Sequence, residues 1–251
     1  MSRALASLMS LAVVFAASPV RAADDDPKEI LAKAVKAHGG EDFLGKHPAA
    51  RSKNKGKINL PGVGEAEFTQ DIAYMIPGKF RDTMELTVMN QTITIVTIMN
   101  GDTISIRVMD KDVPITDDIK KAIADASNML SIARIAPLLK EKGYELSAFG
   151  ETKVEGKPAV GVRVASKGKK DVTLFFDKKT DLLVKIESRM TDANTGNEVA
   201  EERIITEYRK DKDGHPVPKK VLVNRDGKAF IEAESTELIY LEKIDDSEFK
   251  K

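Results

Sequence analysis

The sequence of 251 residues contains no cysteine and no tryptophan. Without cysteine the chain can form no disulfide, no thiolate metal site and no acylated cysteine anchor, and it has no cysteine nucleophile. An excess of charge is also absent, because 40 Lys and Arg residues are matched by 40 Asp and Glu residues. A balanced charge offers no basic field to neutralise phosphates, so we expect no nucleic-acid partner.

Long apolar runs are scarce, and the main one lies at the start of the chain. Segment 4–17 is apolar apart from two serines and follows Arg3, but it is shorter than the roughly 20 residues that span a bilayer as a helix. Small residues around Ala22 suit a signal peptidase. We therefore expect 1–22 to be a cleaved secretory signal and the product to be periplasmic or otherwise exported, with no later transmembrane segment. An uncleaved membrane anchor is the alternative.

Residue patterns for catalysis are missing as well. The three histidines, His38, His47 and His215, have no metal-ligand spacing such as HExxH. No GxSxG occurs, and no Gly-Lys pair is followed by the Ser or Thr of a phosphate loop. We expect no catalytic residue, no metal and no cofactor, and hence a protein that is not an enzyme.

Two segments carry the signals of helices. Asp26 can cap a helix whose first residue is Pro27, and apolar residues then recur with helical spacing. This pattern predicts a helix over 27–38. A second helical segment covers 117–142, and Pro137 must interrupt it because proline has no backbone N–H to donate.

The rest of the sequence alternates with the period of two that is typical of strands. Phe68, Ile72 and Tyr74 share one predicted face. The dipeptide Asn100-Gly101 between two such runs predicts a type I′ hairpin, in which both central residues need positive φ. We expect about five strands over 52–108 and further strands at 144–154, 158–166, 170–177, 182–191, 198–209, 217–225 and 229–242.

A dozen antiparallel strands seldom form one open twisted sheet without curling. The sequence therefore predicts a mainly β (α+β) fold for a single monomeric domain over 23–251. Its architecture is expected to be a strongly curved antiparallel half-barrel of about 11–12 strands, with an N-terminal helix and a mid-chain helical lid at about 117–142.

Three short segments resemble motifs of one family, and the order of the predicted elements matches that family's layout. Together they make the chain resemble the LolA/LolB-like lipoprotein-sorting family of outer-membrane lipoprotein carriers. Pro77-Gly78-Lys79-Phe80-Arg81 is similar to the family's Arg-Pro-x-x-Phe-Arg strand start, Met99-Asn100-Gly101-Asp102-Thr103 to its Ser-Asp-Gly-Lys-Thr hairpin, and Phe176-Asp177-Lys178-Lys179-Thr180-Asp181-Leu182-Leu183 to its later strand-turn-strand.

The resemblance implies a periplasmic binding or carrier protein that holds a hydrophobic moiety, the acyl chains of a lipid or lipoprotein, in the concave face of the sheet. The lining residues that we expect are Phe68, Ile72, Tyr74, Phe80, Met84, Leu86, Ile104, Ile106, Ile132 and Ile135.

One position departs from the family pattern. The carrier has an arginine before the motif's proline that holds the lid closed, and this chain has Ile76 there. Arg81 and Arg107, on neighbouring predicted strands, are candidate polar contacts in its place. The chain also lacks the cysteine through which a LolB-like receptor is lipid-anchored.

A second hypothesis comes from a different class of function. The chain would be a non-catalytic interaction or envelope sensor module, its cavity filled by its own lid, with envelope proteins as partners. The charge-rich strand 198–209 is the first candidate surface for such a partner.

Overall fold

The computed structural model describes residues 26–251, so the expected signal at 1–22 lies outside the described residues. Among residues 26–251, no helix combines the length and the apolar character needed to cross a membrane. The described part of the chain forms 13 strands in one sheet, four α-helices and a short 3-10 helix. The helices are α1 (Pro27–Ala37), α2 (Gly40–Lys46), α3 (Asp117–Ala133), α4 (Ala136–Lys140) and η1 (Asp246–Phe249).

The sheet is antiparallel and consists of two meanders. The first contains β1 (Ala49–Leu60), β2 (Gly64–Met75), β3 (Lys79–Val88), β4 (Gln91–Asn100), β5 (Thr103–Val108) and β6 (Lys111–Val113). The second contains β7 (Tyr144–Val154), β8 (Lys157–Ser166), β9 (Val172–Asp177), β10 (Leu183–Thr191), β11 (Glu198–Lys210), β12 (Pro216–Arg225) and β13 (Lys228–Leu241).

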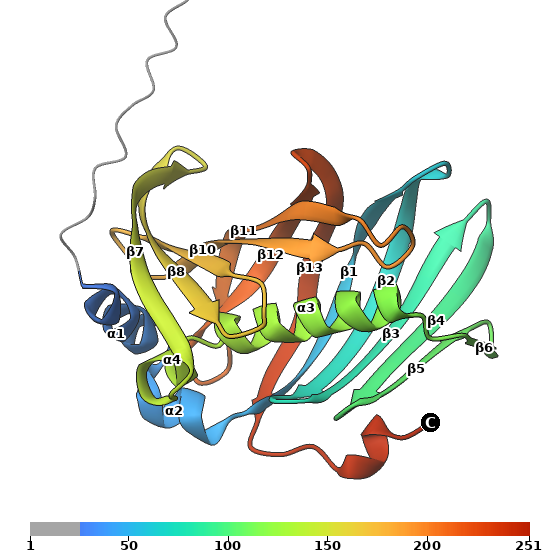
Figure 1. The fold of residues 1–251 in the computed structure, drawn as a ribbon, viewed down its shortest axis with the longest axis horizontal. Coiled ribbons are helices and arrows are strands. Elements are labelled where there is room, and N and C mark those ends of the chain that lie inside the picture. The colour runs from blue at the N-terminus through green and yellow to red at the C-terminus, as the bar shows by residue number, and fades with distance from the viewer. Residues whose placement is uncertain (1–25) are drawn as a thin grey trace, which may run out of the picture.

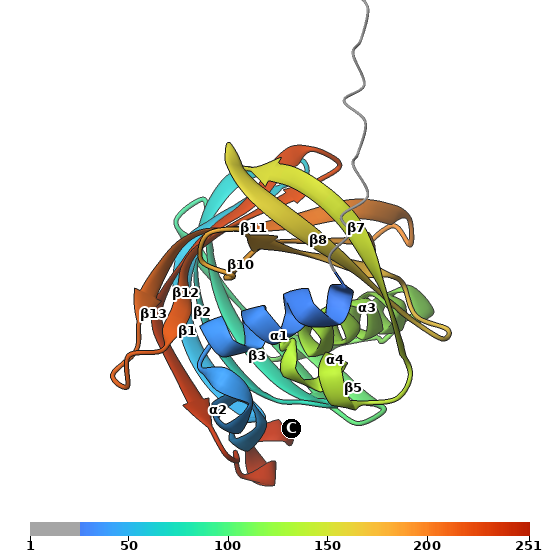
Figure 2. The ribbon, with the colours of Figure 1, turned by 90° about the vertical axis from the view of Figure 1, so that its left-hand side faces the viewer.

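The two meanders join where the first strand pairs with the last. The strand order is β6-β5-β4-β3-β2-β1-β13-β12-β11-β10-β9-β8-β7, so β6 and β7 are the edges. The sheet curves strongly, and α1, α3 and α4 lie inside the curve (Figure 2). Helix α3 crosses the concave side from the β5 end toward α4 (Figure 1). The predicted curved half-barrel with a crossing helical segment is confirmed.

Two details of the predicted fold differ from the structure. The thirteenth strand, β6, was not predicted, since three residues are too few to show an alternating pattern. The prediction of a type I′ turn with Asn100 and Gly101 as its central residues was wrong. Asn100 pairs with Thr103, so the loop residues are Gly101 and Asp102. Of these two only Gly101 has positive φ, at 60°, which is the requirement of a type II′ turn.

The helices begin and end where the local sequence directs. The Asp26 carboxylate accepts a hydrogen bond from the Lys28 amide at 2.9 Å and caps α1. Thr116 Oγ1 caps α3 by accepting from the Ile119 amide at 3.3 Å. Helix α3 ends two residues before Ile135, which has a φ of 53°. A new helix with proline in its first turn then begins, so the break expected near Pro137 is present.

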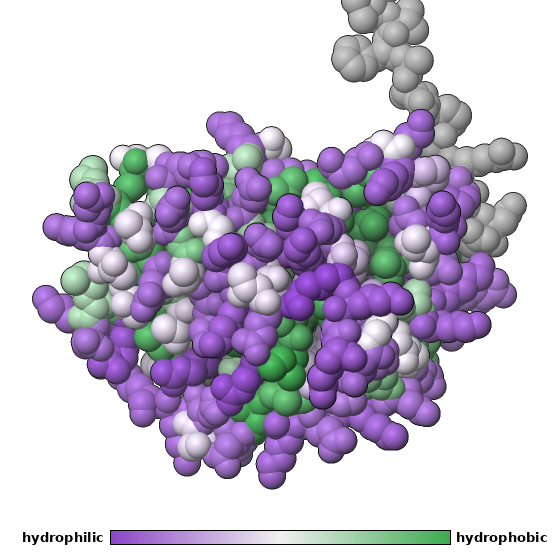
Figure 3. All heavy atoms as spheres, turned by 180° about the vertical axis from the view of Figure 1, so that it is seen from behind, coloured by the Kyte–Doolittle hydropathy of each residue, from purple (hydrophilic) through white to green (hydrophobic). Residues whose placement is uncertain are grey.

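The main core lies between the helices and the second meander. Leu31 of α1, Ile132 of α3 and Leu174 of β9 are all 0% exposed in this core. A smaller core lies on the convex side, where Phe249 of η1 packs on Ala73 and Ile98. Seen from behind, the molecular surface is mainly hydrophilic with small apolar areas (Figure 3). Few large apolar side chains are therefore exposed on this face.

At Gly56 the backbones of the two meanders lie close together. Gly56 lies opposite Ala233 of β13, and a Cβ at this position would lie 2.0 Å from the Glu232 backbone oxygen. A side chain here would push β1 and β13 apart, and backbone atoms cannot rotate away as a flexible side chain would.

We therefore expect Gly56→Ala to lower the free energy of unfolding by roughly 1–3 kcal/mol or more, measured by urea denaturation. Gly45→Ala is the matched control. A Cβ at Gly45 would meet no neighbouring group within 4 Å, and replacing a helical glycine should raise stability by about 0.5–1 kcal/mol. Equal stability of Gly56→Ala and wild type would contradict the tight junction.

Candidate functional site

A cavity of about 460 Å³ lies between the concave face of the sheet and the underside of α3. Strands β1, β2 and β3 contribute to its floor, and so do β11, β12 and β13 from the other end of the chain. Apolar side chains dominate the lining. It consists of Ser52, Asn54, Phe68, Gln70, Ile72, Tyr74, Phe80, Asp82, Met84, Ala126, Met129, Leu130, Arg203, Pro218, Val221, Val223, Ile231, Ala233, Ser235 and Leu238.

A second cavity of about 200 Å³ adjoins the first. The two share Tyr74, Leu130, Pro218 and Leu238 in their linings. The smaller one extends toward α1, α2 and the break between α3 and α4. Together they form a continuous apolar region beneath the helices.

Half of the predicted lining residues come together in the larger cavity. Phe68, Ile72, Tyr74, Phe80 and Met84 all line it. They meet because each is on the same face of β2 or β3 and the two strands are paired, for example Tyr74 with Phe80.

Three other predicted residues share this face of the sheet but lie beside the cavity. Leu86 is 6% exposed and packs with Phe68 in a neighbouring cluster. Ile104 and Ile106 lie on β5, on the same face as Phe80 by way of their partners on β4. Neither contributes to the lining of the cavities beneath α3.

The two predicted residues of the helical segment are separated. Ile132 is 0% exposed and packs in the main core against the second meander, outside the cavity linings. Ile135 lines the smaller cavity. The side chains of α3 that face the larger cavity are Ala126, Met129 and Leu130.

Arg81 and Arg107 were the candidate substitutes for the carrier's lid arginine, and both make their polar contacts away from α3. Arg81 lies on the convex face and donates to the carbonyl oxygens of Glu248 and Lys250, at 3.3 and 3.4 Å. Arg107 pairs with Asp110 at 3.2 Å in an exposed hairpin. Successive residues of a strand point to opposite faces, so an inward Phe80 requires an outward Arg81.

Arg134 is a polar contact that sequence reasoning missed. It follows the last residue of α3, and its Nη2 donates to the Leu44 carbonyl oxygen at 2.8 Å, which ties α3 to α2. Its Nη1 is buried and has no hydrogen-bond partner among residues 26–251. Arg134 also lines the smaller cavity. No local signal marks it, because its partner is a backbone carbonyl from a distant segment.

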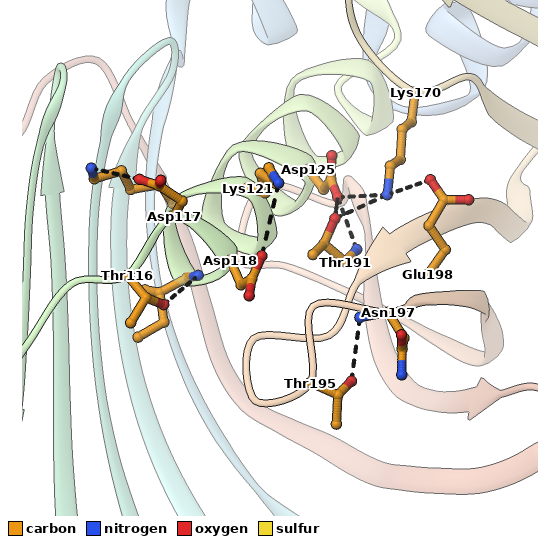
Figure 4. A network of polar contacts seen from close by, with 12 residues as sticks. Thr116, Asp117, Asp118, Lys121, Asp125, Lys170, Thr191, Thr195, Asn197 and Glu198 are labelled. Carbon is orange, nitrogen blue, oxygen red and sulfur yellow. Dashed lines mark hydrogen bonds and ion pairs between the residues drawn. The ribbon is translucent and has the colours of Figure 1, made fainter.

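A network around Asp125 holds the middle of α3 to the second meander (Figure 4). The amide and the hydroxyl of Thr191 both donate to Asp125 Oδ2 at 2.8 Å. Lys170 Nζ lies 3.1 Å from the same oxygen and 3.0 Å from Glu198. Asn128 donates to the Lys170 carbonyl oxygen at 3.1 Å. Polar contacts on the flank of α3 thus position its apolar side over the cavity.

Polar side chains also cross the floor of the larger cavity. Asn54 Nδ2 donates to Gln70 Oε1 at 3.3 Å, and Gln70 Nε2 donates to Asp82 Oδ2 at 2.8 Å. The other oxygen, Asp82 Oδ1, is buried without a partner among the described residues. Burial raises the pKa of Asp82 to about 6, against the opposing effect of the Gln70 hydrogen bond.

No protein-family model matches the chain, and no curated protein sequence matches it. Solved structures do. A DUF1329 family protein from Desulfovibrio piger is 16% identical with a TM-score of 0.55, covering 90% of this chain and 98% of that one. A LolA superfamily protein from Nitrosomonas europaea is 10% identical with a TM-score of 0.53, with the same coverage of 90% and 98%. The chain therefore has a LolA-like fold, and the resemblance drawn from the sequence is confirmed at the level of the fold.

The raised pKa of Asp82 predicts a pH-dependent stability. The folded pKa, about 6, lies above the ordinary value of 3.8, so the native state binds this proton more tightly than the unfolded state does. The favourable contribution is complete below pH 4 and is lost as pH rises through about 6. Asp82→Asn should gain stability over wild type between pH 4 and pH 7.5 by up to about 3 kcal/mol.

Urea denaturation of both proteins at the two pH values measures this gain. Asp102→Asn, in an exposed turn, is the control and should follow wild type. If the free energies of unfolding of Asp82→Asn and wild type differ by the same amount at pH 4 and pH 7.5, the Asp82 carboxylate is not desolvated.

Proposed function

We propose that this protein is a periplasmic, non-enzymatic carrier that binds the acyl chains of a lipid or lipoprotein in the cavity beneath α3. The observation that carries the proposal is the apolar cavity of about 460 Å³ lined by both meanders and by α3. A single α-helix covers it, and that helix is attached to the second meander through polar contacts such as those of Asp125.

The cavity suits a flexible hydrocarbon chain. Its apolar lining continues into the adjoining cavity of about 200 Å³, which gives a bent chain room to extend. Burial contributes about 0.8 kcal/mol per methylene, so one long acyl chain would bind with useful affinity and could still be released. The LolA-like fold supports this class of function, although fold alone does not assign the cargo.

The alternative of a sensor module with a filled cavity is less well supported. Ala126 and Leu130 of α3 line the larger cavity without filling it. The charge-rich strand β11 also offers less free charge than its sequence suggests. Glu201 is 2% exposed and accepts from Arg203 at 2.8 Å and from Arg225 at 2.9 Å.

The carrier proposal predicts that filling the cavity displaces the ligand. Wild type purified gently from its own envelope should show a lipid-sized adduct in native mass spectrometry. Ala126→Phe adds an aromatic ring inside the cavity and should reduce the bound fraction about tenfold. Ala124→Phe is the matched control, because Ala124 is on the same helix but exposed. Wild type that remains bare in every lipid extract would contradict the proposal.

Ligand entry requires α3 to move, with the break at Arg134 and Ile135 as the hinge. Amide exchange should then be faster across 117–133 than in β3 and β4, and should slow when lipid is added. Asp125→Asn removes the charge that Thr191 and Lys170 contact, so it should accelerate exchange in α3 by roughly tenfold, as expected from about 1–3 kcal/mol.

Asp117→Asn is the control for this exchange experiment, because the Asp117 side chain is 85% exposed and, within residues 26–251, pairs only with Lys120 on its own helix. Protection across 117–133 that equals the protection of the central strands and ignores every lipid would show that α3 is a fixed part of the core.

A further inference from the structure

The inward face of β3 is apolar except at one position. Phe80, Met84 and Leu86 are on this face, and Asp82 lies between them. Its cross-strand partner on β2 is Ile72. A branched apolar side chain at this position would continue the same surface and would bury no carboxylate. Packing therefore gives no reason for a carboxylate at position 82.

The hydrogen bonds between the polar residues of the floor all run in one direction, from donor to acceptor. Asn54 donates to Gln70 at 3.3 Å, and Gln70 donates to Asp82 Oδ2 at 2.8 Å. The chain of donors ends at the carboxylate. Asp82 Oδ1 is left as a buried acceptor with no donor among residues 26–251.

A buried acceptor without a donor is costly. Leaving such a group unpaired incurs the full cost of removing it from water, and this cost is larger when the group is charged. Asp82 is among the residues that line the cavity, so its carboxylate borders the space that a bound molecule would occupy. The other charged residue of the lining, Arg203, already donates to Glu201 at 2.8 Å.

We propose that Asp82 is a ligand-binding residue whose Oδ1 accepts a hydrogen bond from a hydroxyl or amide N–H of the bound amphiphile. The inference rests on the proposed carrier function and narrows its cargo. The ligand carries a neutral hydrogen-bond donor beside its hydrocarbon chain, as an acylglycerol with a free hydroxyl or an N-acylated amine does. A hydroxyl brings one donor for this one acceptor oxygen, whereas an ammonium group brings three donors and must itself be desolvated, which offsets its attraction to the carboxylate.

The test compares three ligands of equal chain length. Dodecanol, dodecyl methyl ether and dodecylamine each displace the apolar fluorophore diphenylhexatriene from the full protein at pH 7.5. Wild type should bind dodecanol about tenfold more tightly than the ether, since a hydrogen bond to a charged group contributes about 1.5–3 kcal/mol. In Asp82→Leu the ratio of the two affinities should fall to about one, because dodecanol loses its acceptor.

Thr97→Val is the matched control. Thr97 lies directly opposite Asp82 on β4 and is outside the lining of the cavity, so its loss should leave the ratio unchanged. If Asp82→Leu does not fold, Asp82→Asn keeps the shape of the side chain and should lower the ratio several-fold by removing the charge.

The outcomes separate this inference from the carrier function. Equal binding of dodecanol and the ether by wild type would overturn the role of Asp82 and leave the carrier proposal standing. Tighter binding of dodecylamine than of dodecanol would overturn the inference that the ligand's hydrogen-bond donor is neutral. Failure of all three ligands to displace the fluorophore would overturn both proposals.

Discussion

The pairing of β1 with β13 joins two meanders that would otherwise be separate sheets. These strands are more than a hundred residues apart along the chain, so their pairing is a strongly non-local contact. It brings Ser52 opposite Leu238 and Asn54 opposite Ser235, and all four residues line the larger cavity. The cavity exists only because this junction forms, since each meander supplies half of the floor.

The sequence revealed the strands far better than their arrangement. The alternation of apolar and polar residues is a local signal, so it located twelve of the thirteen strands. It missed β6 because three residues are too few to show an alternation. The turn at Gly101 was assigned to the wrong type because Asn-Gly and Gly-Asp are both favoured hairpin dipeptides, so the segment Asn100-Gly101-Asp102 fits either register. The β1–β13 pairing has no local signal, because any strand with a buried face could pair with β1 equally well.

The same limit applies to the site. The alternation of side chains between the two faces of a strand correctly predicted that Phe80 points into the cavity. The same alternation requires Arg81 to point to the opposite face, and our prediction for Arg81 ignored this consequence. Helical periodicity was less decisive, because α3 has apolar residues on two sides. Leu130 faces the cavity and Ile132 faces the main core. The anchors Asp125 and Arg134 could not be predicted, because they bind backbone atoms of distant segments.

Polar contacts and apolar packing hold different parts of α3, and this difference explains how such a cavity can open. The polar anchors of α3 are a few side-chain hydrogen bonds, made by Asp125 and Asn128 on its flank and by Arg134 just after its C-terminal end, and each contributes only about 0.5–3 kcal/mol. One of the two apolar sides of α3 packs in the main core through Ile132, and the other covers a space that it does not fill, so fewer dispersion contacts hold α3 than hold a helix packed on a complete core. Asp125 therefore positions α3 without fixing it as firmly as a continuous apolar contact would. A ligand that fills the space would supply the missing contacts, and occupancy and closure of α3 would then favour each other.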